Sequence, residues 1–271
     1  MSELVAKRLQ VALQAAKEAG DYLIRTKREI AVDKKGARDL VTTADRGSEA
    51  IIRQILINEF PEDVFFGEES GGTDAAAFSG LERVWIVDPL DGTTNYVRGF
   101  TDYGISIAFY EKGRPLIGVI AAPEKGELFQ AVAGQGAFLN GEPIRVSQVS
   151  TMIDALVATG FPYEPDERGG NNTDHVANIV PLIHDLRRMG AAALDLASVA
   201  CGRLDGFWEF GLSAWDVAAG ILLVQEAGGM VSGFAGEPVN IFAGRIVATN
   251  RLIHQLLLAA LARGQTGFVA K

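Results

Sequence analysis

The sequence has few of the residues on which covalent or soft-metal chemistry depends. Cys201 is the only cysteine among 271 residues, and there are three histidines. One cysteine cannot form an intrachain disulfide, which favours a reducing compartment. Cys201 ends the apolar run 197–201, where a buried thiol is a simpler interpretation than a nucleophile. We expect His175, His184 and His254 to lie on helices away from the acidic motifs and outside catalysis.

Long apolar runs and basic clusters are also missing. The longest apolar stretches are far shorter than the ~20 residues of a membrane-spanning helix. Residues 1–28 mix charges through a helical period, unlike the apolar core of a signal peptide. We therefore expect a cytoplasmic protein without a membrane partner. The net charge is −9 and the pI about 4.9, which argues against nucleic acid as a partner.

The remaining composition, 48% apolar and 22% charged, is that of a globular protein. An acidic protein that handles a small anionic phosphate needs bound cations or a local group of donors, so metal ligands are the first features to look for. Apolar periodicity predicts a long helix over 3–28 and a second helix that begins near Thr43. Four short apolar runs then predict strands at 84–87, 104–110, 116–122 and 127–132.

After residue 150 the pattern becomes an alternation of strands and helices. We expect strands at 155–159, 186–189, 205–210 and 246–249, and helices at 174–184, 191–201, 214–227 and 250–263. This division predicts two lobes, an α+β lobe over 1–150 and an α/β lobe over 151–271.

The chemical centre of the sequence is the segment Trp85-Ile-Val-Asp-Pro-Leu-Asp-Gly-Thr-Thr-Asn95. A buried strand delivers Asp88, Pro89 is expected to turn the chain out of the sheet, and Asp91 follows. Two carboxylates on a rigid turn can share Mg²⁺, which prefers oxygen ligands. Gly92 and the threonines after it could start a helix whose amides hold a phosphate. The alternative is a surface turn whose aspartates only cap that helix.

Two further segments place acids in apolar surroundings. Phe65-Phe-Gly-Glu-Glu-Ser70 puts Glu68 directly after a strand-like run, and Ala214-Trp-Asp-Val-Ala-Ala-Gly220 puts Asp216 at the start of an apolar helix. Asp216 alone is explained equally well as a charge that interacts with the dipole of that helix.

Taken together, these motifs resemble the inositol monophosphatase family. Residues 88–95 are similar to its first signature and residues 215–229 to its second, and 67–70 and 39–45 match two further segments in the right order. The resemblance runs from about residue 4 to residue 263. It implies an α/β (α+β) fold, the layered α-β-α-β-α sandwich of the inositol monophosphatase and fructose-1,6-bisphosphatase type.

The resemblance also implies a site with two to three Mg²⁺ ions. In the family, the positions that match Glu68, Asp88 and the Leu90 carbonyl bind the first metal, and those that match Asp88, Asp91 and Asp216 bind the second. Glu68 would reach a weaker third ion through water. The Thr93 hydroxyl, paired with Asp45, would orient the attacking water.

Substrate contacts are carried over in the same way. The amides of Gly92 and Thr93 would hold the phosphate and Asp91 would lie beside it, while Glu209 would contact substrate hydroxyls. The segment 190–192 (Gly190, Ala191 and Ala192) would line the pocket. Lys34, or the adjacent Lys35, matches a basic residue near the metals. Arg187 and Arg188 precede the pocket segment and could reach a second phosphate or be solvated charges.

The expected activity is hydrolysis of myo-inositol monophosphate, with lithium inhibition and a homodimer as family properties. Ser213 stands where well-known animal members carry histidine, and 190–196 and 205–208 look more like bacterial members. Two alternatives therefore remain. One is a phosphatase of the same fold that acts mainly on fructose 1,6-bisphosphate or another sugar or nucleotide phosphate. The other is a regulatory interaction protein in bacterial RNA synthesis whose phosphatase activity is secondary.

Overall fold

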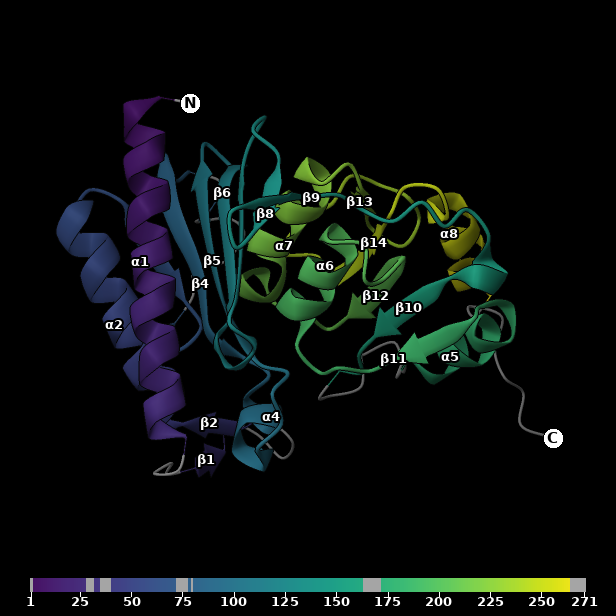
Figure 1. Cartoon of the computed structure of the whole chain (residues 1–271), viewed down its shortest axis with the longest axis horizontal. Coiled ribbons are helices and arrows are strands. Elements are labelled where there is room, and N and C mark those ends of the chain that lie inside the picture. The colour runs from purple at the N-terminus through teal and green to yellow at the C-terminus, as the bar shows by residue number, and fades with distance from the viewer. Residues whose placement is uncertain are drawn as a thin grey trace.

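The computed structural model describes residues 2–27, 32–34, 40–71, 78, 80–162 and 172–263, with the side chains of 32–34, 40 and 41 excluded. The chain folds into five layers that alternate helices and sheets (Figure 1). The α-β-α-β-α sandwich that the resemblance implies is thus confirmed. No helix in the described part of the chain is long and apolar enough to cross a membrane.

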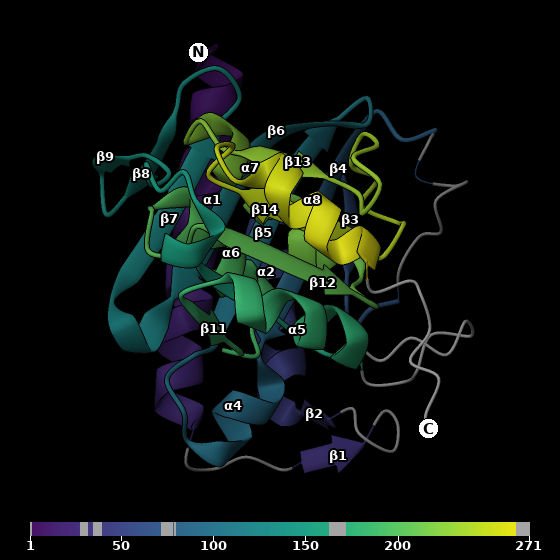
Figure 2. The ribbon, with the colours of Figure 1, turned by 90° about the vertical axis from the view of Figure 1, so that its right-hand side faces the viewer.

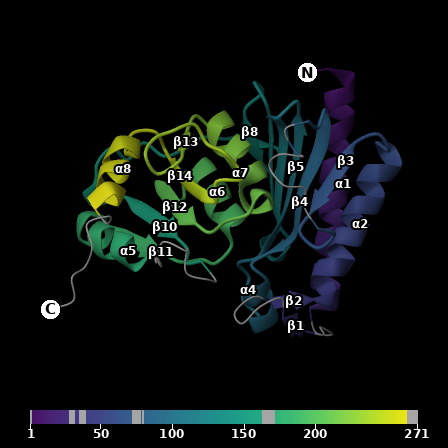
Figure 3. The same ribbon diagram turned by 180° about the vertical axis from the view of Figure 1, so that it is seen from behind.

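The outer helical layer on one side consists of α1 (Glu3–Thr26) and α2 (Thr43–Glu59). Their apolar faces pack on a seven-stranded sheet, and the buried side chains between the helices and the sheet form one hydrophobic core. Figure 3 shows both helices along this sheet from behind. The small hairpin of β1 (Val32–Lys34) and β2 (Leu40–Thr42) precedes α2.

The seven-stranded sheet has the order β3-β4-β5-β6-β7-β8-β9. Only its first pair, β3 with β4, is parallel among the described strands, so the sheet is mixed. The strands are β3 (Val64–Gly67), β4 (Arg83–Asp91), β5 (Gly104–Glu111), β6 (Arg114–Ala122), β7 (Glu127–Val132), β8 (Ala137–Leu139) and β9 (Glu142–Ile144).

The middle helical layer is α6 (Ala192–Ala200) and α7 (Ala214–Glu226). Both are apolar nearly all round, as expected for helices with a sheet on each side. Close approach to the first sheet depends on Gly118, where an added Cβ would lie 2.7 Å from the Ala219 carbonyl oxygen. The largest core of the molecule surrounds these two helices.

The second sheet has the order β11-β10-β12-β14-β13, with parallel and antiparallel pairs. Its strands are β10 (Leu156–Thr159), β11 (Asp185–Arg187), β12 (Gly206–Phe210), β13 (Met230–Ser232) and β14 (Arg245–Thr249). The last layer, α5 (Thr173–Ile179) and α8 (His254–Arg263), covers its outer face (Figure 2). The expected division into two lobes near residue 150 stays a prediction, although the first sheet ends at Ile144 and the second begins at Leu156.

Several expectations about local structure were wrong. Pro89 does not end its strand, because β4 continues to Asp91 through a shift in its register with β5. The helix expected over 250–263 begins only at His254, since the Asn250 side chain accepts from the amides of Leu252 and Ile253 and holds a turn. His184 lies outside a helix, between a 3₁₀ turn that ends at Leu182 and β11.

Candidate active site

The acids of the central motif lie at the end of β4, buried between the first sheet and the middle helices. Asp88 is 2% exposed and Asp91 is 9% exposed. Asp88 Oδ1 accepts from the Leu90 amide at 3.0 Å, so the turn itself orients this carboxylate. Asp91 Oδ2 accepts from the Ala193 amide at 2.7 Å. That bond ties the end of β4 to the first turn of α6.

Glu68 and Asp216 reach the same place from two other elements. Glu68 directly follows β3, and its amide donates to the carbonyl of Val87 in the parallel strand β4 at 3.2 Å. Asp216 lies in the first turn of α7, where its Oδ2 accepts from the Ser213 amide at 2.6 Å in a capping box. Ser106 of β5 donates to the carbonyl of Trp215 at 3.0 Å and holds this helix start against the sheet.

The acids at this point repel one another. Burial raises the pKa of Asp88 well above its usual range, and the charges of Glu68, Asp91 and Asp216 raise it further. Burial raises the pKa of Asp91 to about 6, against the lowering effect of amides at the start of α6. The pKa of Asp216 is also raised by burial and then by Asp91 and Glu68. A set of buried carboxylates that repel one another is stabilised either by protonation or by a bound cation.

The donor set fits a hard divalent cation, because it consists of carboxylate oxygens and the nearby Leu90 carbonyl. Within the described residues, no three acidic, histidine or cysteine side chains close around a single point. Glu68, Asp91 and Asp216 are nevertheless close enough to Asp88 to raise its pKa. Like-charged carboxylates repel one another, and a bound cation would draw them together. The metal-binding roles of Glu68, Asp88, Leu90, Asp91 and Asp216 stay predictions.

Thr93 and Asp45 form the pair that the resemblance implies. Thr93 Oγ1 donates to Asp45 Oδ1 at 3.0 Å and also lies 3.1 Å from the Leu90 carbonyl oxygen. Asp45 is oriented in turn by Thr42, whose amide and hydroxyl donate to Asp45 Oδ2 at 2.7 and 2.6 Å. Gly92, with a φ of 86°, turns the chain into α4 (Thr93–Arg98). A hydroxyl held in this way keeps its lone pairs for a water molecule.

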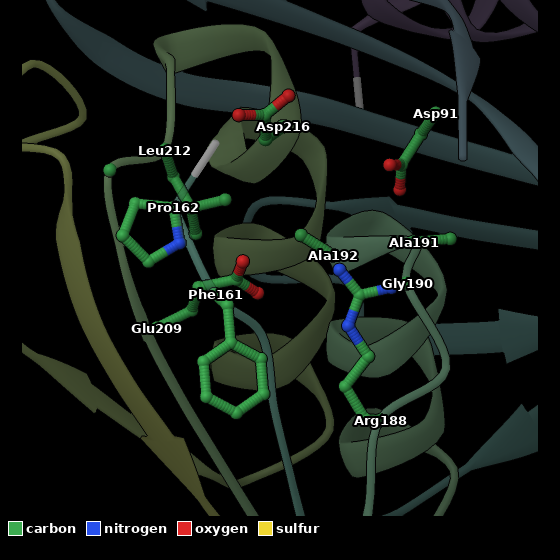
Figure 4. A pocket seen from close by; sticks show the side chains of 11 residues that line it. Asp91, Phe161, Pro162, Arg188, Gly190, Ala191, Ala192, Glu209, Leu212 and Asp216 are labelled. Carbon is green, nitrogen blue, oxygen red and sulfur yellow. The ribbon is translucent and has the colours of Figure 1, made fainter. Parts of the chain in front are cut away.

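A pocket opens beside the acids, between the end of β4 and the second sheet. Its empty volume is about 510 Å³ when the open mouth is included. Figure 4 shows the Asp91 and Asp216 carboxylates at one end and the Arg188 guanidinium reaching toward the middle. The wall includes the segment predicted to line it, Gly190, Ala191 and Ala192, together with Glu209 of β12.

Two more carboxyl groups lie on this side of the site. Burial, followed by the charge of Asp91, raises the pKa of Glu209 to about 8, while Arg188 acts in the opposite direction. Asp195 of α6 is 1% exposed, and its Oδ1 has no hydrogen-bond partner. Its pKa is raised by burial and then by Glu209. The single charge in the apolar run 191–200 is the sequence signal that could have revealed Asp195.

The basic residues that were expected near the site lie in different places. Arg187 does not enter the pocket, because its exposed side chain forms an ion pair with Asp185 and projects from the strand β11. The next residue, Arg188, lines the pocket instead. Arg188 lies just beyond the end of β11, and its side chain does not follow that of Arg187. Lys34 lies in β1, but its side chain and all of Lys35 lie outside the described residues.

Asn95 is a further residue that the sequence argument did not assign. Its Nδ2 donates to the carbonyls of Asp102 at 2.6 Å and of Met189 at 2.7 Å. It thereby joins the segment before β5 to the segment before α6. The position of Gly190 in the pocket wall depends on this bond. His175, His184 and Cys201 are not among the residues that line this pocket.

The comparisons with known proteins give one family. A family model described as the inositol monophosphatase family matches residues 4–266. "Nus factor SuhB" of Pseudomonas aeruginosa is 43% identical, covering 93% of this chain and 95% of the relative. "Inositol-1-monophosphatase" of Synechocystis sp. is 42% identical, covering 94% and 88%.

A solved inositol monophosphatase from Anabaena (Nostoc) sp. superposes with a TM-score of 0.85 at 41% identity, covering 94% of this chain and 95% of that one. The family model matches nearly the whole chain, the two relatives are more than 40% identical, and the solved structure has the same layered fold. The chain belongs to the inositol monophosphatase family.

Proposed function

We propose that this chain is a Mg²⁺-dependent phosphomonoesterase that hydrolyses myo-inositol monophosphate to inositol and inorganic phosphate. Glu68, Asp88, Asp91, Asp216 and the Leu90 carbonyl would hold two to three Mg²⁺ ions. Bound Mg²⁺ would polarise the phosphate and make a water molecule a stronger nucleophile. The family comparison supports the reaction class, since relatives named inositol-1-monophosphatase cover most of the chain.

The residues of the chain would position the other groups. The Thr93 hydroxyl donates to Asp45, so its oxygen can accept a hydrogen bond from the attacking water and orient the water oxygen toward phosphorus. The amides of Gly92 and Thr93 would bind the phosphate oxygens, and Glu209 would contact a hydroxyl of the substrate. As the water oxygen bonds to phosphorus the ester P–O bond breaks, and the leaving oxygen takes up one proton, which balances the proton that the water loses. No covalent phosphoenzyme is required.

One observation carries the proposal: acids that follow β3, end β4 and begin α7 converge beside the pocket, where Glu68, Asp91 and Asp216 raise the pKa of the buried Asp88. The direct test is phosphate release from myo-inositol 1-phosphate with Mg²⁺, and in parallel with EDTA. Rapid release that EDTA abolishes would support both the reaction and the metal ligands. Lack of release from several phosphate esters in Mg²⁺ would contradict the proposal.

A second candidate substrate is fructose 1,6-bisphosphate, and Arg188 favours it. Its guanidinium lines the pocket, and in the described part of the chain it forms no hydrogen bond or ion pair. A guanidinium is well suited to bind a second phosphate. Measuring kcat/KM on the bisphosphate and on inositol 1-phosphate side by side ranks the two candidates.

A role as an interaction protein is the third candidate, because a relative named Nus factor is as similar as one named inositol-1-monophosphatase. Asp88→Asn distinguishes the interaction role from the phosphatase role, because it should disable metal binding and leave β4 folded. Binding to transcription factors that survives this substitution would support a separate interaction role.

We also propose a homodimer and lithium inhibition, both from family membership. Elution near twice 28.9 kDa would support the dimer, and elution as a monomer would contradict it. Lithium should lower the rate of phosphate release at fixed Mg²⁺. Rates that are independent of lithium would remove that claim.

A further inference from the structure

Helix α2 contacts the three segments that carry the candidate site. Asp45, Ser48 and Glu49 occupy positions i, i+3 and i+4, so they lie on one helix face near the start of α2. All three side chains are buried, with exposures of 1%, 0% and 5%. Asp45 accepts from Thr93, as described above. The other two residues have no assigned role in the proposed reaction.

Ser48 contacts the turn between the two aspartates of β4. Its Oγ donates to the carbonyl oxygen of Pro89 at 2.7 Å. Pro89 lies between Asp88 and the Leu90 carbonyl, the two groups predicted to share the first metal. The hydroxyl therefore fixes the peptide on which both ligands depend.

Glu49 contacts the segment that carries Glu68. Its Oε2 accepts from the Glu69 amide at 2.7 Å. The same oxygen packs against Gly67, where an added Cβ would lie only 2.4 Å from it. Glu49 thus contacts both chain neighbours of Glu68, which are Gly67 and Glu69. A larger residue at Gly67 would displace the Glu49 carboxylate.

We propose that Ser48 and Glu49 are positioning residues that set the separation between Glu68 and the Asp88–Leu90 turn, and so the affinity of the site for Mg²⁺. The inference rests on the proposed function, because it takes these groups as ligands. Without the two bonds, β3 still pairs with residues 84–87 of β4, but Glu68 and the Asp88–Leu90 turn, which lie beyond the paired residues, lose their shared contact with α2. Repelling carboxylates then move apart, and the free energy needed to gather them around a cation increases.

The test is the dissociation constant of Mg²⁺, measured by titration calorimetry without substrate. Glu49→Ala should weaken binding about 10- to 100-fold, the usual effect of removing a group that orients a metal ligand. Ser48→Ala should weaken it in the same direction by a smaller factor. Glu49→Gln keeps an oxygen that can accept from the Glu69 amide, and should bind within about threefold of the wild type. For each variant, kcat should recover at saturating Mg²⁺ while the concentration needed for half activity rises.

Two variants control for side-chain loss elsewhere. Glu59→Ala removes a glutamate from the last turn of α2 that forms an exposed pair with Lys7. Ser232→Ala removes a buried hydroxyl in the second sheet that donates to the Gly233 carbonyl at 2.7 Å. Both should bind Mg²⁺ as the wild type does. A cooperative thermal transition in EDTA establishes that each variant is folded, and if Glu49→Ala is not, Ser48→Ala decides by the same criterion.

Wild-type affinity in the alanine variants would overturn the inference. So would equal weakening in Glu49→Gln and Glu49→Ala, because it would mean that the charge of Glu49, and not its position, matters. A wild-type protein that binds no Mg²⁺ is a different result, since it would overturn the proposed function and the inference with it.

Discussion

The two ends of β4 each bury acidic side chains, but only one end neutralises them. Near its start, Asp63 accepts from Arg8 at 3.0 Å, from Arg83 at 2.8 Å and from the Trp85 indole at 3.2 Å. The Arg8 guanidinium also lies 4.7 Å and 4.5 Å from the ring centres of Phe60 and Phe109. Asp63 has two arginine partners at this end, so we call it the paired end.

At the other end, Asp88 and Asp91 meet Asp216 and Glu68. In the described part of the chain no lysine or arginine forms an ion pair with any of the three aspartates. A fold that places arginines on one buried acid could have done so on the others. Buried unpaired carboxylates destabilise a fold, and proteins keep such costs mainly at functional sites. The difference between the two ends supports a site that recruits its positive charge from solution.

The largest expected effect comes from Asp88→Asn, which removes one of the repelling charges. Phosphate release should fall about a thousandfold, roughly 4 kcal/mol of lost transition-state stabilisation, because metal-assisted catalysis supplies several kcal/mol. In EDTA the same variant should unfold at a higher temperature than the wild type, since a buried repulsion has been relieved. Phosphate-release kinetics and a thermal melt in EDTA give both numbers. Activity above a tenth of the wild type, or a lower unfolding temperature, would contradict this account.

Disrupting the paired end should have the opposite effects, a loss of stability with little change in activity. Asp63→Ala leaves Arg8 buried without its acid, which typically costs about 3–5 kcal/mol of folding free energy. The unfolding midpoint in urea should shift accordingly, while kcat at a temperature where the variant is folded should stay near the wild-type value. The exposed pair Lys7–Glu59 is the control, since Glu59→Gln should change stability by under about 1 kcal/mol. A stable but inactive Asp63→Ala would mean that the two ends are not independent.

The pH dependence of stability should sharpen the comparison. Folding raises the pKa of Asp91 to about 6 and of Glu209 to about 8, so the folded state binds these protons more tightly than the unfolded state does. Their stabilising contribution is present in acid and is lost as the pH rises through 6 and then 8. In EDTA the unfolding temperature should therefore fall between pH 6 and pH 8. Excess Mg²⁺ should counter the fall, because it binds the ionised carboxylates.

Glu209→Gln separates the two groups in this experiment. The glutamine has no proton to lose, so the decline in EDTA between pH 6 and pH 8 should flatten, because Glu209 contributes up to its folded pKa of about 8. The decline below pH 6, to which Asp91 contributes, should remain. An unfolding temperature that rises from pH 6 to 8 in EDTA would show that the acids are not strained in the metal-free fold.

The sequence predicted most of the elements, because apolar periodicity determines a helix or strand directly. It misplaced those that depend on tertiary contacts: β4 continues through Pro89 because β5 pairs again at Asp91, and α8 starts late because the Asn250 side chain stabilises a turn. The acids of the site were identified from motifs whose spacing reflects the fold. Ser48 and Glu49 were missed, although their spacing from Asp45 put them on the same helix face. Their partners, Pro89 and Glu69, are 41 and 20 residues away, and only the assembled fold reveals them.

The smallest predicted effect concerns the two neighbouring arginines. Arg188 faces the pocket and Arg187 pairs with Asp185 on the exposed side, so they form a matched pair of variants. Arg188→Ala should lower kcat/KM for fructose 1,6-bisphosphate about tenfold, near 1.4 kcal/mol, which is typical of a charged hydrogen bond. It should change the value for inositol 1-phosphate by less, because that substrate has no second phosphate. Arg187→Ala should leave both values unchanged. Equal losses on the two substrates would mean that Arg188 shapes the pocket without selecting charge, and the bisphosphate candidate would lose its main support.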